Sequence, residues 1–155
     1  MASERPQPSG GCARGSPPLI VVDVSVAAKW FLRDERSRFA ESILYRVVEE
    51  TACVPALFRW ELQNVLLVAQ RASRMTNDDV NEALDSLRDL PVFVDPPGER
   101  VFAGSEIQIA RHYDLTPYDA AYLALAANRR IALATSDADL AHAATDLGLV
   151  VLFDA

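Results

Sequence analysis

The run Leu19-Ile20-Val21-Val22-Asp23 decides the fold class. Its four apolar residues show no polar alternation, which predicts a strand covered on both faces, as in a parallel sheet. The strand stops at Asp23, and a helical stretch, residues 25–32, follows it. Ligands of open α/β sheets bind beyond the carboxyl ends of the strands. Asp23 is therefore the first candidate for a functional residue.

The rest of the chain repeats the alternation of short strands with helices. This pattern predicts an α/β domain of three layers, a mainly parallel five-stranded sheet flanked by about seven helices. We expect it to span residues 19–155, after a flexible tail, residues 1–18, that is rich in Pro, Gly and Ser. Further strands are expected at 52–54, 92–94, 131–134 and 149–153, and further helices at 36–50, 55–72, 76–89, 100–113, from 116 onward and from 138 to 147.

The composition limits the kind of function. The 155 residues carry a net charge of −7, which disfavours a general nucleic-acid coat protein but not an enzyme that acts on RNA. No apolar run reaches the ~20 residues of a membrane span, and the N-terminus lacks a secretory signal. The two cysteines, Cys12 and Cys53, form no disulfide framework. We expect a cytoplasmic protein in which Cys53 is an ordinary buried thiol.

Four carboxylates lie where the predicted fold would open toward one crevice. Asp23 and Asp137 follow strands, Asp119 lies in the first turn of a helix, and Glu61 lies about two turns into the helix at 55–72. Each has a simpler interpretation. Asp23 suits a turn, Glu61 a solvated helix face, Asp119 the helix dipole and Asp137 a helix cap. Their combination favours a shared acidic site.

Carboxylates that converge in this way repel one another and raise one another's pKa values. A hard divalent cation relieves the repulsion, and Mg²⁺ or Mn²⁺ prefers oxygen ligands. Such an ion can activate water for attack on phosphorus and stabilise the leaving oxygen. The two histidines, His112 and His142, have no partner pattern that would compete with this scheme.

Four segments resemble the PIN-domain family, and within it the VapC-type toxins of bacterial toxin–antitoxin pairs. They are residues 21–31, 55–65, 115–126 and 133–140, in the order in which the family has them. The Asp-x-Ser start and the Tyr-Asp-Ala-Ala-Tyr-Leu stretch at 118–123 are the more specific parts. The resemblance covers the chain from Leu19 onward and leaves out residues 1–18.

The resemblance implies strand order 3-2-1-4-5, an Mg²⁺- or Mn²⁺-dependent endoribonuclease that cuts RNA, a homodimer, and a cognate VapB-type antitoxin. It also assigns residue roles. It makes Asp23, Glu61, Asp119 and Asp137 the acidic catalytic set, Asp23 and Asp119 the direct metal ligands, Ser25, Asn64, Thr135 and Ser136 the supporting polar residues, and Asp139 an extra acid for which a solvated position is the simpler interpretation.

Two other classes stay open. A HAD-type phosphatase or dehalogenase, or a receiver domain, would use Asp23 as a covalent nucleophile. Such folds place a lysine late in the chain, whereas the only lysine, Lys29, lies in the first helix. A PIN-like scaffold would bind RNA or protein without cutting.

An antitoxin could place an arginine in the acidic pocket. Apolar side chains of the first helices could line its groove, although core packing explains them equally well: Trp30, Phe31, Phe58 and Leu66.

Overall fold

The sheet has the predicted topology. The computed structural model describes residues 20–95 and 105–154. Within them, five strands form one sheet in the order β3-β2-β1-β4-β5, and every neighbouring pair is parallel. The predicted α/β fold and strand order are therefore confirmed. The strands are β1 (Ile20–Val22), β2 (Ala52–Val54), β3 (Val92–Val94), β4 (Ala132–Thr135) and β5 (Val151–Phe153).

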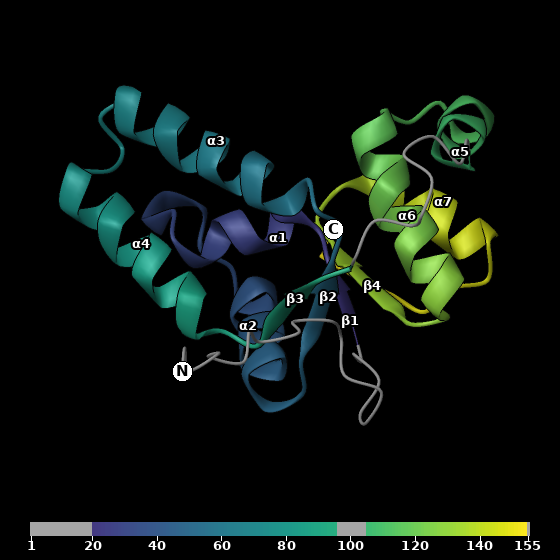
Figure 1. Cartoon of the computed structure of the whole chain (residues 1–155), viewed down its shortest axis with the longest axis horizontal. Coiled ribbons are helices and arrows are strands. Elements are labelled where there is room, and N and C mark those ends of the chain that lie inside the picture. Colours follow the sequence, from purple (N-terminus) through teal and green to yellow (C-terminus); the bar gives the residue numbers. More distant parts are fainter. Residues whose placement is uncertain (1–19, 96–104, 155) are drawn as a thin grey trace, which may run out of the picture.

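Helices cover both faces of this sheet. In Figure 1 the helices α1 to α4 lie on one side of the strands and α5 to α7 on the other. The chain adds β2 and β3 on one side of β1 and then β4 and β5 on the other side. Right-handed crossovers in these two directions place the connecting helices on opposite faces of the sheet. They are α1 (Val24–Ala27), α2 (Arg38–Glu49), α3 (Phe58–Arg71), α4 (Asn77–Asp89), α5 (Ser105–Tyr113), α6 (Pro117–Arg129) and α7 (Ala138–Asp146).

The core lies on both faces of β1. All three of its residues are at most 1% exposed. Helix α6 packs against β1 and β4, and its apolar residues Leu123 and Ala126 are fully buried, so it is a central helix of the fold. Cys53 in β2 is a buried free thiol, also as predicted. Burial on both faces explains why β1 shows no alternation of polar residues.

Three helix boundaries differ from the prediction. The expected helix at 25–32 is the short α1 followed by a 3-10 turn, η1 (Ala28–Trp30), and a second 3-10 turn, η2, covers Arg33–Glu35. The expected helix at 36–50 starts at Arg38, because Ser37 caps it and accepts a bond from the N–H of Ala40 at 3.0 Å. The expected helix at 55–72 starts only at Phe58.

Local capping residues define other helix ends. Thr76 and Asp79 form a capping box at the start of α4. Thr116 caps α6, with Pro117 in its first turn. Gly148, at φ +72°, follows α7 in a left-handed conformation that favours glycine.

Some predictions lie outside the described residues. These are the tail at 1–18, Leu19, and the part of the expected helix that covers 100–104. Among the described residues, no helix is both long and apolar enough to cross a bilayer.

Candidate active site

Asp23 is held at the junction between β1 and β4. Its N–H donates to the carbonyl of Ala134 at 2.9 Å, so the residue extends the pairing of the two strands. Its side chain is nearly buried, and the residue is 3% exposed. The Oδ2 atom accepts a hydrogen bond from Ser25 Oγ at 2.5 Å and one from Thr135 Oγ1 at 2.8 Å. The supporting positions Ser25 and Thr135 thus contact the carboxylate directly.

The backbone after β4 fixes these two hydroxyls. The N–H of Ser136 donates to Ser25 Oγ at 2.9 Å, and the N–H of Asp137 donates to Thr135 Oγ1 at 3.0 Å. Because each hydroxyl accepts a backbone proton, its own proton is available for Asp23. The segment 135–137 therefore orients a carboxylate that lies 112 or more residues earlier in the chain.

Glu61 and Tyr122 connect the two sides of the site. Helix α3 begins at Phe58, so Glu61 lies in its first turn. The predicted position, about two turns into the helix, is therefore wrong. Glu61 Oε2 accepts a hydrogen bond from the hydroxyl of Tyr122 at 2.6 Å, and Tyr122 belongs to α6. Residues from α3 and α6 are thus joined across the carboxyl edge of β1. The sequence reasoning missed Tyr122, although it lies three residues after Asp119 and so on the same face of α6.

Three of the predicted acids act on one another. Burial raises the pKa of Asp23 above its usual range, and the charge of Asp119 raises it further, although hydrogen bonds from Ser25 and Thr135 oppose the shift. Burial likewise raises the pKa of Glu61, and the charges of Asp23 and Asp119 add to the effect, against the hydrogen bond from Tyr122. The pKa of Tyr122 is also raised, by its burial and by the bond to Glu61. Asp23, Glu61 and Asp119 therefore share one electrostatic site.

Asp119 has a defined orientation at the start of α6. Its N–H donates to Thr116 Oγ1 at 3.1 Å, and the Thr116 hydroxyl donates to Asp119 Oδ2 at 2.5 Å. Within the described chain, Oδ1 of Asp119 makes no hydrogen bond. One carboxylate oxygen is therefore fixed, while the other is available to a ligand.

The remaining predicted acids lie differently. Asp137 is the N-cap of α7, and its Oδ1 accepts a bond from the N–H of Leu140 at 2.8 Å. Its charge does not contribute to the raised pKa of Asp23 or Glu61. Asp139 is exposed in the first turn of α7. A direct role for these two acids stays a prediction.

A polar cluster that the sequence did not reveal lies beside the site. Ser136 Oγ donates to Asp154 Oδ1 at 2.7 Å and accepts from Lys29 Nζ at 2.9 Å. Lys29 Nζ also lies 3.4 Å from Asp154 Oδ2, which accepts from Ser37 Oγ at 3.2 Å. Burial by itself would raise the pKa of Asp154, but the Ser136 bond and the Lys29 charge bring it below its usual value. No local pattern connects these residues, because only the sheet topology brings them together.

The donor set suits a hard divalent cation. Among residues 20–95 and 105–154, no group of three or more His, Cys, Asp or Glu side chains is arranged to hold a metal ion by itself. Mg²⁺ needs fewer protein ligands, since it is usually bound by one or two carboxylates and keeps several waters. Asp23 and Asp119 offer carboxylate oxygens, and a cation there would compensate both the burial and the Asp119 charge that raise the pKa of Asp23.

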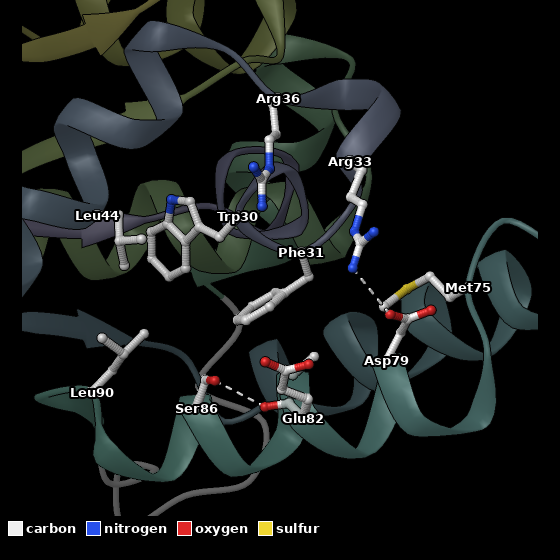
Figure 2. A pocket seen from close by; sticks show the side chains of 11 residues that line it. Trp30, Phe31, Arg33, Arg36, Leu44, Met75, Asp79, Glu82, Ser86 and Leu90 are labelled. Atoms are coloured by element: carbon white, nitrogen blue, oxygen red, sulfur yellow. Dashed lines mark hydrogen bonds and ion pairs between the residues drawn. The ribbon is translucent and has the colours of Figure 1, made fainter.

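A separate cavity lies between η1 and α4. Figure 2 shows Phe31 pointing into it beside Trp30, with Met75 and Leu90 at its other walls. Arg33 approaches Asp79 at 3.5 Å at its edge. Of the four apolar residues considered for a partner groove, Phe31 alone is only half-buried. Trp30, Phe58 and Leu66 are buried in the core.

The fold and the acidic site agree with the family to which the sequence is similar. Carboxylates gathered at the carboxyl edge of a parallel sheet of order 3-2-1-4-5 define an α/β protein with an acidic site at its topological switch point. Residues 20–146 match the model of the PIN domain, and the chain belongs to the PIN-domain family. The predicted family is thus confirmed.

Two solved structures share the fold. PAE2754 from Pyrobaculum aerophilum is 19% identical with a TM-score of 0.59, and the match covers 88% of this chain and 90% of the other. FitAcB from Neisseria gonorrhoeae is 16% identical with a TM-score of 0.60, and the match covers 88% of this chain and 97% of the other. At these identities the likeness concerns the fold. No curated protein matches the sequence.

Proposed function

We propose that this protein is an Mg²⁺- or Mn²⁺-dependent endoribonuclease, the toxin of a VapBC-type toxin–antitoxin pair. PIN domains are typically metal-dependent nucleases. The observation that carries the proposal is the buried Asp23, whose pKa is raised by burial and by Asp119. Burying a carboxylate beside others is costly, and a function that binds a cation explains why the cost is tolerated.

The residues have distinct roles in this proposal. Asp23 and Asp119 hold the ion, and Glu61, fixed by Tyr122, completes the acidic pocket. When bound, the ion polarises water and stabilises the charge that develops on the phosphate. Ser25 and Thr135 keep Asp23 in one orientation, because both donate to the same oxygen.

The outer residues support this arrangement. Ser136 fixes Ser25 through its N–H, and Asn64 lies on the exposed face of α3 near the same loop, where both residues line one cavity. Asp137 orients α7 as its cap and is proposed as a fourth acid of the site. Asp139 is exposed and is left as an accessory acid.

The test measures cleavage of single-stranded RNA by purified variants. Asp23→Asn and Asp119→Asn should each abolish cleavage in Mg²⁺ or Mn²⁺, because each removes a charge that holds the ion. EDTA should stop the wild-type enzyme, and either ion should restore it. Asp114→Asn is the matched control, since Asp114 is exposed and its φ of 54° suits Asn equally well.

Three results would contradict the proposal. Retained cleavage by both variants would remove the acidic site from the chemistry. Binding of RNA without cutting by the wild type, together with no response to Mg²⁺, would favour the scaffold. A phospho-aspartate at Asp23 after incubation with a phosphodonor would favour the aspartyl phosphotransfer class.

The proposed partners follow from the same site. An antitoxin of the VapB type would neutralise the pocket by inserting an arginine, whose guanidinium binds carboxylates in two places. The cavity at Phe31 is the proposed seat for its apolar side chains (Figure 2). Co-expression with a small co-encoded protein should yield a complex that lacks RNase activity. Light scattering of the free protein tests the proposed homodimer.

A further inference from the structure

The only lysine of the chain is linked to Asp23 through two serines. Lys29 is on η1, and its Nζ donates to Ser136 Oγ at 2.9 Å. The N–H of Ser136 binds Ser25, which in turn donates to Asp23. The Lys29 side chain is 21% exposed, so its ammonium group is largely but not fully removed from water.

Lys29 also lines a cavity that adjoins the Asp23 site. The cavity has a volume of about 460 Å³, and its polar lining includes Ser25, Asn64 and Ser136. Two of these, Ser25 and Ser136, belong to the hydrogen-bond network that fixes Asp23. The volume falls in the range of roughly 300–1,000 Å³ that small-molecule sites occupy. A group seated here would therefore lie next to the group bound at Asp23.

Two positively charged side chains, Lys29 and Arg74, line this cavity, and nearby carboxylates neutralise them to different extents. Arg74 contacts two carboxylates, Asp34 at 2.7 Å and Glu35 at 2.5 Å. Among the described residues, Lys29 has one carboxylate partner, Asp154, at 3.4 Å, which is longer than the roughly 2.7–2.9 Å of a close charge-assisted hydrogen bond. An ammonium group has three donors, and at most two of those of Lys29 have partners among the described residues. Lys29 can therefore accept a further anion.

We infer that this cavity binds the phosphate of a nucleotide next to the one that is cut, with Lys29 as the anion-binding side chain. The inference rests on the proposed ribonuclease function. An RNA strand carries a negative charge at every nucleotide, and the acidic pocket repels all of them except the one that its cation holds. A cation beside the pocket offsets this repulsion at the neighbouring phosphate. Asn64 lines the same space, and its side-chain amide offers additional hydrogen-bond donors.

The competing explanation is purely structural. In it, Lys29 only pairs with Asp154 and thereby fixes the loop that carries Ser136. The two explanations differ for Asp154→Asn. A structural ion pair is broken equally from either end. In that case Asp154→Asn and a variant that removes the Lys29 charge should lose the same activity. A phosphate site loses affinity when Lys29 is removed but not when the competing carboxylate of Asp154 is neutralised.

The experiment uses the full chain and one RNA substrate. The wild-type cut in a mixed-sequence 20-nucleotide single-stranded RNA is mapped first. The RNA is then resynthesised with one neutral methylphosphonate, on a 2′-O-methyl ribose, at each linkage flanking the cut in turn. KM and kcat are measured for wild type, Lys29→Met, Lys29→Arg and Asp154→Asn. Arg46→Met is the matched control, because it removes one positive charge paired with Glu50 on α2.

Lys29→Met should raise KM about tenfold, the size expected for one charge-assisted contact, with a smaller change in kcat. It should also lower the slope of log KM against log salt by about 0.7, the value of one phosphate contact on a single strand. One methylphosphonate position should raise the wild-type KM and leave that of Lys29→Met unchanged. Lys29→Arg should recover part of the loss, while Asp154→Asn and Arg46→Met should not raise KM.

Failure of the inference is separable from failure of the function. If the wild type cuts the RNA and Lys29→Met has the wild-type KM and salt slope, the inferred phosphate-binding site is wrong, while the proposed ribonuclease function is supported. Equal losses in Lys29→Met and Asp154→Asn, with no position-specific methylphosphonate effect, establish the structural ion pair instead. If the wild type neither cuts nor binds RNA, the proposed function is wrong and this inference falls with it.

Discussion

Asp23→Asn should make the metal-free protein more stable at neutral pH. Asp23 is 3% exposed, and its charge is opposed by burial and by Asp119. Asparagine has nearly the same shape and keeps an oxygen that can accept from Ser25 and Thr135. Leaving a buried polar group poorly compensated costs about 1–3 kcal/mol, and more when it is charged. We expect the substitution to raise the free energy of unfolding by about 2 kcal/mol, or Tm by about 6 °C in a domain of this size.

The pH dependence gives this prediction its sign. Because the pKa of Asp23 is higher in the folded state than its ordinary value of 3.8, the unfolded chain loses this proton first. The destabilisation is therefore absent well below pH 3.8, grows as the pH rises through that value, and is complete above the folded pKa. The advantage of Asp23→Asn should accordingly be larger at pH 7.5 than below pH 3.8.

Thermal unfolding in EDTA and in Mg²⁺ is the assay. Mg²⁺ at ten times its Kd should stabilise the wild type by about 1.4 kcal/mol and should barely affect Asp23→Asn. Asp114→Asn, on the exposed surface, should stay within about 0.5 kcal/mol of the wild type under every condition. A Tm for Asp23→Asn at or below that of the wild type, in EDTA at pH 7.5, would refute the reasoning that the buried charge is costly.

Other variants test separate parts of the structure. Tyr122→Phe removes the hydrogen bond that lowers the pKa of Glu61, so the rising limb of the pH–rate profile should move to higher pH, with a stability loss of about 1 kcal/mol seen by urea unfolding. In the wild type, cleavage should increase with pH as Asp23 and Glu61 ionise, and a pH–rate profile that starts below their ordinary pKa values measures the rise. Gly148→Ala meets no atom within 4 Å, so its backbone strain at φ +72° alone should cost about 1–2 kcal/mol. Thr76→Ala should cost about 1 kcal/mol by loss of the capping box, as calorimetry would show.

Features that depend on near neighbours were predictable from the sequence. The start of α6 follows from Thr116 and Pro117, whose side chains act within one turn, and the structure has the cap in place. Strands β1 and β2 could be found because burial on both faces excludes polar residues from them. The sheet order came from the family resemblance rather than from these local patterns.

Features that depend on the assembled sheet were not predictable. From the sequence, Tyr122 is indistinguishable from the other apolar residues of a buried helix. Only the position of α3 shows that its hydroxyl donates to Glu61. The cluster of Lys29, Ser136 and Asp154 joins η1, the end of β4 and the end of β5, which no spacing along the chain reveals. The break between α1 and η1 was also missed, because apolar periodicity over so few residues does not separate an α-helical turn from a 3-10 turn.

The bond from Thr135 to Asp23 also bears on how the protein is made. The two residues lie 112 positions apart, so a chain still emerging from the ribosome carries Asp23 long before the hydroxyl that orients it. At about 5–20 residues per second, the interval is on the order of ten seconds. During that time Asp23 lacks one of the two hydroxyls that orient it, so the acidic site is completed only after β4 has been synthesised.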